Sequence, residues 1–296
     1  MKKTVSIFLL FALIFTQFGF TAKSVEINNN LAINADTFGY LVREMLTEYD
    51  TEGDGIQTYS ISENNEFSSC RLIVKSSENI DTSGAVSVIS GYKNLWVLQY
   101  DSEEKTKSGF EYYNSLPFVE YAEPDTAVEM YSVSSETLDK SRLSWGSEAI
   151  GADDPLTVVS DMNLPEIKVG IIDSGIDYNH EFLKERIIDE GYNFSTSGDS
   201  TSMSDDPKSH GTHVAGIIVD NTPENVKIKG YKIFNSSGNS SNVAVVAAVE
   251  QAVADGMDII NMSFGGSSSS AVRESLLDAY NKGVTLVAAT GNTYQH

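Results

Sequence analysis

Two short stretches of this sequence contain residue types that serve in nucleophilic catalysis. The first, Val169-Gly-Ile-Ile-Asp-Ser-Gly-Ile-Asp177, is an apolar run that leads into an Asp, a Ser and a Gly. The second, His210-Gly-Thr-His-Val-Ala-Gly216, begins with a His and continues into an apolar run. A serine hydrolase relay needs a carboxylate that orients an imidazole, and an imidazole that takes the proton of the nucleophile. Asp173 and His210 are therefore the candidate catalytic residues.

The elements predicted around these residues place them at one edge of a sheet. The run from Val169 to Ile172 is short, apolar and followed by turn residues, which is typical of a buried parallel strand. Asp173 then stands at the carboxyl end of that strand, where open α/β sheets carry their functional sites. The apolar run from 214 to 219 predicts a helix that begins near His210, and Gly211 leaves room beside the imidazole.

Strands and helices alternate through the rest of this half of the chain. Apolar runs predict the strands, and apolar residues at helical spacing predict helices that end before a glycine. Strands are expected at 167–172, 226–234, 258–263 and 284–289, and helices at 242–255 and 271–281. This alternation predicts the α/β class, with a parallel sheet, right-handed crossovers and flanking helices.

Four motifs, in order along the chain, resemble those of the subtilases, the subtilisin-like serine peptidases. They are DSGID at 173–177, HGTHVAG at 210–216, INMSFGG at 260–266 and VAATGN at 287–292. An Asp that precedes the His is also the chain order of subtilisin. The resemblance covers residues 145–292. It implies a serine-type endopeptidase of the S8 family, a subtilisin-like sheet, and proteins or peptides as substrates.

The resemblance also implies roles for individual residues. Asp173 would orient the imidazole, His210 would act as the general base, and Asn292 would donate a hydrogen bond to the oxyanion of the tetrahedral intermediate. Two further segments would bind substrate: one borders the pocket for the residue before the cut bond, and the other pairs with the substrate as an added strand. These candidate substrate-binding residues are Ser263, Phe264 and Gly265 in the first segment, and Gly238, Asn239 and Ser240 in the second.

The nucleophile of the family stands in a Gly-Thr-Ser-x-Ala-x-Pro motif, which these 296 residues do not contain. We therefore expect the N-terminal part of a longer precursor, truncated before the catalytic Ser and inactive as given. The alternative is a non-catalytic product, either a truncated pseudoprotease or a propeptide-type inhibitor or binding protein. The DNA that follows the codon for His296 distinguishes the two, because an open frame that encodes Gly-Thr-Ser supports the precursor.

The first 69 residues are expected to form two segments. Residues 1–22 begin with two lysines and contain an unbroken apolar run at 7–15, which is typical of a secretory signal peptide. The run is shorter than the roughly 20 residues that span a bilayer, and an uncleaved anchor is the alternative. Residues 23–69 are polar and acidic, with one helix around 38–49.

Residues 70–125 have the pattern of a small α+β unit. Strands are expected at 71–75, 85–90, 94–100 and 118–125, with Gly91 in the turn between the second and the third. Asp101 is expected to cap a helix that runs to about Asn114. The unit resembles the subtilase propeptide (inhibitor I9-like), which implies an intramolecular inhibitor and folding aid. Residues 126–142 then form a polar processing linker, and 143–296 the N-terminal part of the peptidase S8 domain.

Composition restricts the partners. The net charge of −22, from 42 acidic and 20 basic residues, argues against nucleic acid and anionic membrane surfaces as partners, and it fits an exported protein. No membrane contact is expected once the signal peptide is cleaved. The single cysteine, Cys70, allows no internal disulfide. No metal site is expected around His210 and His213, because no carboxylate or cysteine cluster joins them. Calcium is compatible with the family, but its usual strong-site loop is not recognisable in this sequence.

Overall fold

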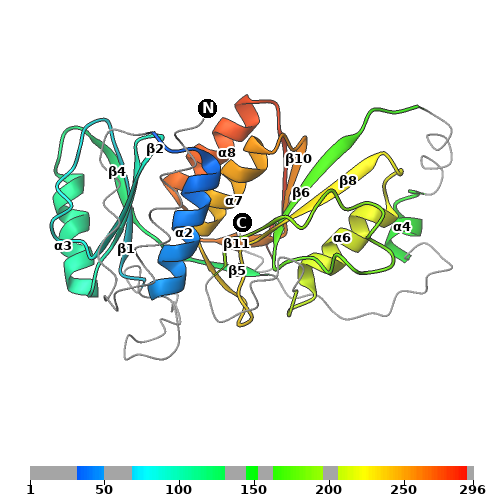
Figure 1. The fold of residues 1–296 in the computed structure, drawn as a ribbon, viewed down its shortest axis with the longest axis horizontal. Coiled ribbons are helices and arrows are strands. Elements are labelled where there is room, and N and C mark those ends of the chain that lie inside the picture. Colours follow the sequence, from blue (N-terminus) through cyan, green and yellow to red (C-terminus); the bar gives the residue numbers. More distant parts are fainter. Residues whose placement is uncertain (1–31, 50–68, 131–144, 153–162, 196–205, 292–296) are drawn as a thin grey trace, which may run out of the picture.

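The computed structural model describes residues 32–49, 69–130, 145–152, 163–195 and 206–291. A parallel sheet and an antiparallel sheet lie on opposite sides of a central group of helices (Figure 1). The predicted signal peptide, 1–22, lies outside the described residues, as does most of the 23–69 segment. No helix in the described ranges is both long and apolar enough to cross a membrane.

The parallel sheet has the strand order β12-β10-β6-β8-β7. Its strands are β6 (Ile167–Asp173), β7 (Tyr192–Asn193), β8 (Val226–Lys232), β10 (Ile259–Met262) and β12 (Thr285–Ala288). The helices of this unit are α4 (Trp145–Ala149), α6 (His210–Asp220), α7 (Asn242–Ala254) and α8 (Ser270–Asn281). The α/β class is confirmed, and each predicted strand and helix of this half exists within about two residues of its expected ends.

Helices cover both faces of β6, which explains why this central strand is apolar from Val169 to Ile172 without alternation. On central strand β6, Val169 and Ile171 pack with Ala215 of α6 on one face. Ile172 belongs to the larger core on the other face, which includes most of α7. The unit from α4 to β12 is called the peptidase unit below.

The antiparallel sheet has the order β2-β3-β1-β4. Its strands are β1 (Arg71–Ser76), β2 (Ser87–Tyr92), β3 (Leu95–Gln99) and β4 (Val119–Pro124), with α3 (Glu103–Asn114) between the last two. The predicted order of three strands, a helix and a strand is confirmed. Leu72 and Leu98 pack beneath α3, whereas Ile73 and Val97 face the opposite way, into the core that contains α7. This sheet with α3 is called the N-terminal unit.

Two local expectations in the N-terminal unit are wrong. Gly91 lies inside β2, and the turn is formed by Lys93 and Asn94, whose φ angles are 48° and 61°. Two residues with positive φ match the type I′ turn of a two-residue hairpin, and Asn is favoured in it. The cap of α3 is Ser102, whose hydroxyl accepts a hydrogen bond from the Lys105 amide, rather than Asp101.

The expected linker, 126–142, is not irregular throughout. Its first part forms β5 (Ala127–Met130), the middle strand of a separate sheet with the order β11-β5-β9. Its neighbours are β9 (Asn239–Ser241) and β11 (Phe264–Gly266), both antiparallel to it. Without β5, the facing edges of β9 and β11 would have unpaired backbone groups, and such edges bind an added strand. The sequence of the linker alone does not reveal that these edges exist.

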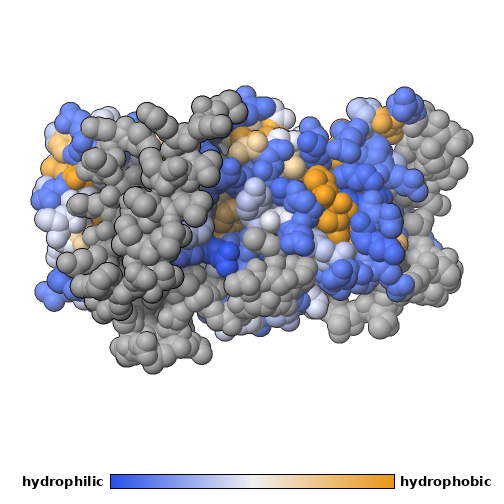
Figure 2. All heavy atoms as spheres, in the orientation of Figure 1, coloured by the Kyte–Doolittle hydropathy of each residue, from blue (hydrophilic) through white to orange (hydrophobic). Residues whose placement is uncertain are grey.

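The surface follows the composition. On the face drawn in Figure 2 most of the coloured atoms belong to hydrophilic residues, and apolar residues gather in small separate patches. This distribution is consistent with the net charge of −22.

Candidate active site

Asp173 and His210, 37 positions apart in the sequence, are in direct contact. Oδ1 of Asp173 lies 2.7 Å from Nδ1 of His210, and the two side chains are 1% and 5% exposed. Asp173 is the last residue of β6, and His210 is the first residue of α6. Since a carboxylate can only accept, Nδ1 carries the hydrogen, and Nε2 is the nitrogen that can take a further proton.

Close packing between α6 and the turn after β6 makes this contact possible. A Cβ at Gly211 would lie 2.1 Å from the carbonyl oxygen of Gly175 and 3.1 Å from Cβ of Asp173. Any side chain at this position would push the helix away from the strand end. The room that the sequence suggested beside the imidazole is therefore used by the backbone of the neighbouring turn.

A second carboxylate, Asp206, supports the pair. Its Oδ1 accepts a hydrogen bond from Ser174 Oγ at 2.7 Å, and its Oδ2 accepts one from the Thr212 amide at 2.8 Å. Ser174 Oγ in turn accepts from the amide of Gly211 at 3.0 Å. The cap residue of α6, Ser209, makes no side-chain cap of its own, so Asp206 takes over that role.

Sequence reasoning did not find Asp206. Its signal was only an acidic residue four positions before His210, in a loop rich in Asp and Ser. The amide of Ser174 also donates to Oδ1 of Asp173 at 2.7 Å. Oδ2 of Asp173 is buried and has no hydrogen-bond partner among the described residues. A buried charged atom with unmet hydrogen bonds is costly, and such atoms concentrate at functional sites.

The expected substrate-binding segments come together around β5. Asn239 and Ser240 lie on β9, with Gly238 just before it, and Phe264 and Gly265 lie on β11, with Ser263 just before it. The chain occupies the space between them with its own residues 127–130. Asn292 lies outside the described residues, while Gly291 before it has a φ of 91°.

In the described part of the chain there is no group of three or more His, Cys, Asp or Glu side chains that could hold a metal ion. Nδ1 of His213 is buried without a hydrogen-bond partner in these same ranges. The thiol of Cys70 is buried on the N-terminal unit, in the core beneath α3.

The parallel α/β sheet carries a buried Asp–His pair at its carboxyl edge, an arrangement compatible with a serine hydrolase relay. Comparison with known families agrees: residues 165–296 match the model of the subtilase family (Peptidase_S8). This part of the chain belongs to the subtilase family, the subtilisin-like serine peptidases.

Individual relatives share this part of the chain. Subtilisin DY of Bacillus licheniformis is 42% identical over 136 residues, which are 43% of this chain and 47% of that protein. An extracellular serine proteinase of Thermus sp. (strain Rt41A) is 32% identical over 187 residues, 60% of this chain and 42% of that protein. The chain thus spans less than half the length of these relatives.

A solved structure extends the likeness of fold upstream. Fervidolysin from Fervidobacterium pennivorans, described as a keratinolytic enzyme related to subtilisin, aligns with a TM-score of 0.57 at 21% identity. The alignment covers 75% of this chain and 40% of that one. At 21% identity this comparison shows similarity of fold alone.

Proposed function

We propose that this chain is part of a secreted subtilisin-like serine endopeptidase precursor that hydrolyses peptide bonds by a Ser-His-Asp relay. The observation that carries the proposal is the buried contact of 2.7 Å between Asp173 and His210, at a strand end and a helix start. Two relatives are named extracellular proteases, and the first 22 residues have the pattern of a secretory signal.

The residues of this chain would do the following work. Asp173 holds the Nδ1–H tautomer of His210 and stabilises the imidazolium that forms when Nε2 takes the proton of the attacking Ser. His210 then gives that proton to the leaving amine. Asn292 would donate its side-chain amide to the oxyanion, a contribution of about 10²–10³ in rate as measured in subtilisin itself. The attacking Ser would have to come from a Gly-Thr-Ser motif, which these 296 residues do not contain.

Substrate would bind as an extended strand between β9 and β11. Strand β5 supports this, since it pairs with Ser240 through Val128 and with Phe264 through Met130. Backbone pairing on both sides accepts many sequences, whereas side-chain pockets select among them. In the precursor, residues 127–130 would fill this site and block it.

The N-terminal unit would serve as the propeptide, and its acidic residues cap two helices of the peptidase unit. The carboxylate of Glu123 accepts hydrogen bonds from Ser269 Oγ and from the amides of Ser270 and Ala271, at 2.6–2.9 Å, at the start of α8. Oδ1 of Asp125 accepts from the Val243 amide at 3.0 Å, at the start of α7. Anions at helix N-termini satisfy unpaired amides and the helix dipole. These contacts support the role of a folding aid, since they satisfy amides at the starts of two helices of the peptidase unit.

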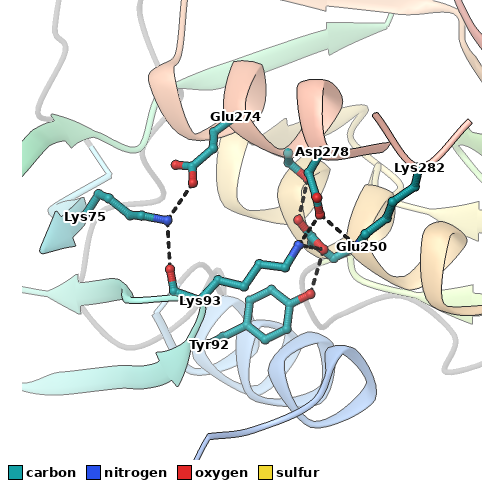
Figure 3. A network of polar contacts seen from close by, with 8 residues as sticks. Lys75, Tyr92, Lys93, Glu250, Glu274, Asp278 and Lys282 are labelled. Atoms are coloured by element: carbon teal, nitrogen blue, oxygen red, sulfur yellow. Dashed lines mark hydrogen bonds and ion pairs between the residues drawn. The ribbon is translucent and has the colours of Figure 1, made fainter. Parts of the chain in front are cut away.

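An ion-pair network adds to this interface (Figure 3). Nζ of Lys75 lies 2.6 Å from Glu274 of α8. Lys93, in the turn of the N-terminal unit, pairs with Glu250 of α7 at 2.7 Å and also with Asp278 of α8. Glu250 is 5% exposed and additionally accepts a hydrogen bond from Tyr92. Oε1 of Glu250 keeps a partner inside the peptidase unit, Ser275 Oγ at 3.0 Å, whereas the partners of Oε2 come from the N-terminal unit. Docking thus supplies the hydrogen bonds that one oxygen of this buried carboxylate needs.

The activating cut would fall within 131–142, the part of the linker beyond β5. Residues 127–130 are paired on both sides and would be presented as the strand before the cut. A cut in this stretch separates the propeptide from the peptidase unit and leaves β5 attached to the propeptide.

The test is self-cleavage and probe labelling in a protein whose residues 1–296 are followed by a segment that carries the Gly-Thr-Ser motif. His210→Ala and Asp173→Asn should each abolish maturation and labelling by a serine-directed fluorophosphonate, since the Ser needs its base and the base its tautomer. Maturation at the normal rate in either variant, with no other protease present, would contradict the assignment.

The 296-residue chain itself provides the complementary test. It should neither react with the probe nor hydrolyse casein, because loss of the Ser alone costs about 2 × 10⁶ in kcat in subtilisin. If the gene encodes no Gly-Thr-Ser segment, the non-catalytic pseudoprotease or inhibitor becomes the better description. Labelling of this chain that depends on His210 would require another nucleophile within it.

A further inference from the structure

Helix α2 (Ala35–Tyr49) lies outside both units in sequence and packs between them in space (Figure 1). Residues 50–68, which are not described, separate it from β1. Its buried residues recur at spacings of three and four, which is the pattern of one helix face. These residues are Ala35, Phe38, Gly39, Val42, Met45 and Leu46, and Tyr40 is 61% exposed.

At Gly39 the backbone of α2 lies tightly against the peptidase unit. A Cβ at this position would lie 2.5 Å from Cε1 of Phe194, the residue that follows edge strand β7. Asp36, one turn earlier, accepts a hydrogen bond from the hydroxyl of Tyr192 at 3.4 Å. The glycine therefore lets the helix backbone lie directly on the aromatic ring, and a methyl group would displace one or the other.

The same face of α2 covers α7. Residues 242–252 of α7 are all buried, and its valines and alanines occupy every side of the helix. A helix that is apolar all round is stable only where every side is covered. The parallel sheet, α8 and α2 each contact it. Removal of α2 would expose apolar surface of the peptidase unit.

α2 is also joined to the N-terminal unit. Phe38 stacks on Tyr92 of β2, with ring centroids 4.6 Å apart and planes at 11°. The amide of Ile33 donates to the carbonyl of Gly91 at 3.0 Å. The helix thus contacts both units at once and does not depend on β5 for either contact.

We infer that the surface formed by α7 and Phe194 is a docking site for an amphipathic helix, and that residues 32–49 are its occupant. In the proposed precursor this helix is an additional anchor, beside β5, the helix caps and the ion-pair network, and it holds the N-terminal unit on the peptidase unit after the linker is cut. The inference rests on the proposed propeptide role for its biological meaning, but the docking itself needs no catalysis.

The experiment uses the full 296-residue chain with the recognition sequence of a site-specific protease inserted within 131–142. After the chain is cut, gel filtration at decreasing concentration gives the dissociation constant of the two fragments. Gly39→Ala should raise the dissociation constant by about tenfold or more, because the added methyl group overpacks against Phe194. Ala favours helix over Gly, so unwinding of α2 cannot account for weaker binding. Tyr40→Ala, on the exposed side of the same helix, should leave retention unchanged.

A second variant protects the test against misfolding. Val42→Asp places a charge on the buried face and should release the fragment at higher concentrations than Gly39→Ala does. The circular dichroism spectrum of each uncut variant is first compared with that of the parent. If Val42→Asp does not fold, the dissociation constant of Gly39→Ala alone tests the inference. Equal retention of Gly39→Ala and the parent would overturn the inference. Because no turnover is measured, this result is separate from failure of the peptidase assignment.

Discussion

Replacement of Asp206 by Ala tests whether the candidate catalytic pair depends on a residue outside both motifs. The carboxylate accepts hydrogen bonds from Ser174 Oγ at 2.7 Å and from the Thr212 amide at 2.8 Å. It therefore joins the residue that follows Asp173 to the first turn of the helix that begins at His210. Without it, the Thr212 amide loses its acceptor, and Ser174 Oγ keeps only a longer contact of 3.2 Å with Oδ1 of Asp173. The strand end and the helix start also lose a direct connection.

The magnitude follows from these two bonds. The bond from Thr212 acts as a helix cap, and removal of a cap costs about 0.5–2 kcal/mol. A hydrogen bond to an ionised group contributes about 1.5–3 kcal/mol when it is well buried. Asp206 is half-buried, so water replaces part of both, and we expect a loss of about 2 kcal/mol in the free energy of unfolding. A protein of this size then loses about 4–8 °C in its unfolding midpoint.

The assay is thermal unfolding followed by circular dichroism, with Glu185→Ala as the control. Glu185 is an exposed acid of the same unit, so this variant matches the change in charge. Asp206→Asn should fall between the parent and Asp206→Ala, because an amide keeps one acceptor oxygen. In hydrogen exchange, the Thr212 amide should lose protection. Equal midpoints for Asp206→Ala and Glu185→Ala, with the Thr212 amide still protected, would refute the reasoning.

Gly211→Ala should prevent the pairing of strand end and helix start, because its Cβ would lie 2.1 Å from a backbone carbonyl; a parent-like unfolding midpoint would contradict this. Glu123→Ala should lower the unfolding midpoint by about 2–6 °C through loss of its hydrogen bonds to the start of α8, whereas Glu120→Ala, at an exposed residue of the same strand, should not. The ion-pair network between the N-terminal unit and the peptidase unit should also weaken in acid. Partial burial acts to raise the pKa of Asp278, but hydrogen bonds from Lys93 and Lys282 outweigh it and hold the pKa below its usual value. A depressed pKa stabilises the fold above the unfolded value of about 3.9, and this contribution is lost as the pH falls through the folded value. In Asp278→Asn, the free energy of unfolding should therefore fall less steeply as the pH is lowered. A pH dependence equal to that of the parent would contradict the role of Asp278 in this network.

Much of the peptidase unit could be predicted because its signals are local. Val169 to Ile172 are apolar without alternation, and only a strand covered on both faces needs that pattern. The turn residues after them place Asp173 at the strand end. The helix signal after His210 is equally local. Their contact needed only the general rule that strand ends and helix starts meet at one edge of an α/β sheet.

The errors arose where neighbouring residues compete for one role. Asp101 and Ser102 both qualify as helix caps, and the choice depends on which backbone takes the extended conformation found at Ser102. Gly91 and the pair Lys93–Asn94 both qualify as the turn. Pairing of β2 with β3 decides between them, since Tyr92 lies opposite Leu95 and leaves only two residues for the loop.

The sequence by itself determined the class of fold, the two candidate catalytic residues and the order of elements in the N-terminal unit, because each depends on patterns within about 15 residues. Tertiary structure alone decided three further features. Asp206 meets Ser174 across 32 positions, residues 127–130 become a strand because edges more than 100 positions away accept them, and α2 covers α7 from the other end of the chain. In each case the local sequence of one partner does not indicate its role. That role depends on apolar surface or hydrogen-bonding groups of a distant segment, which would otherwise be exposed or unpaired.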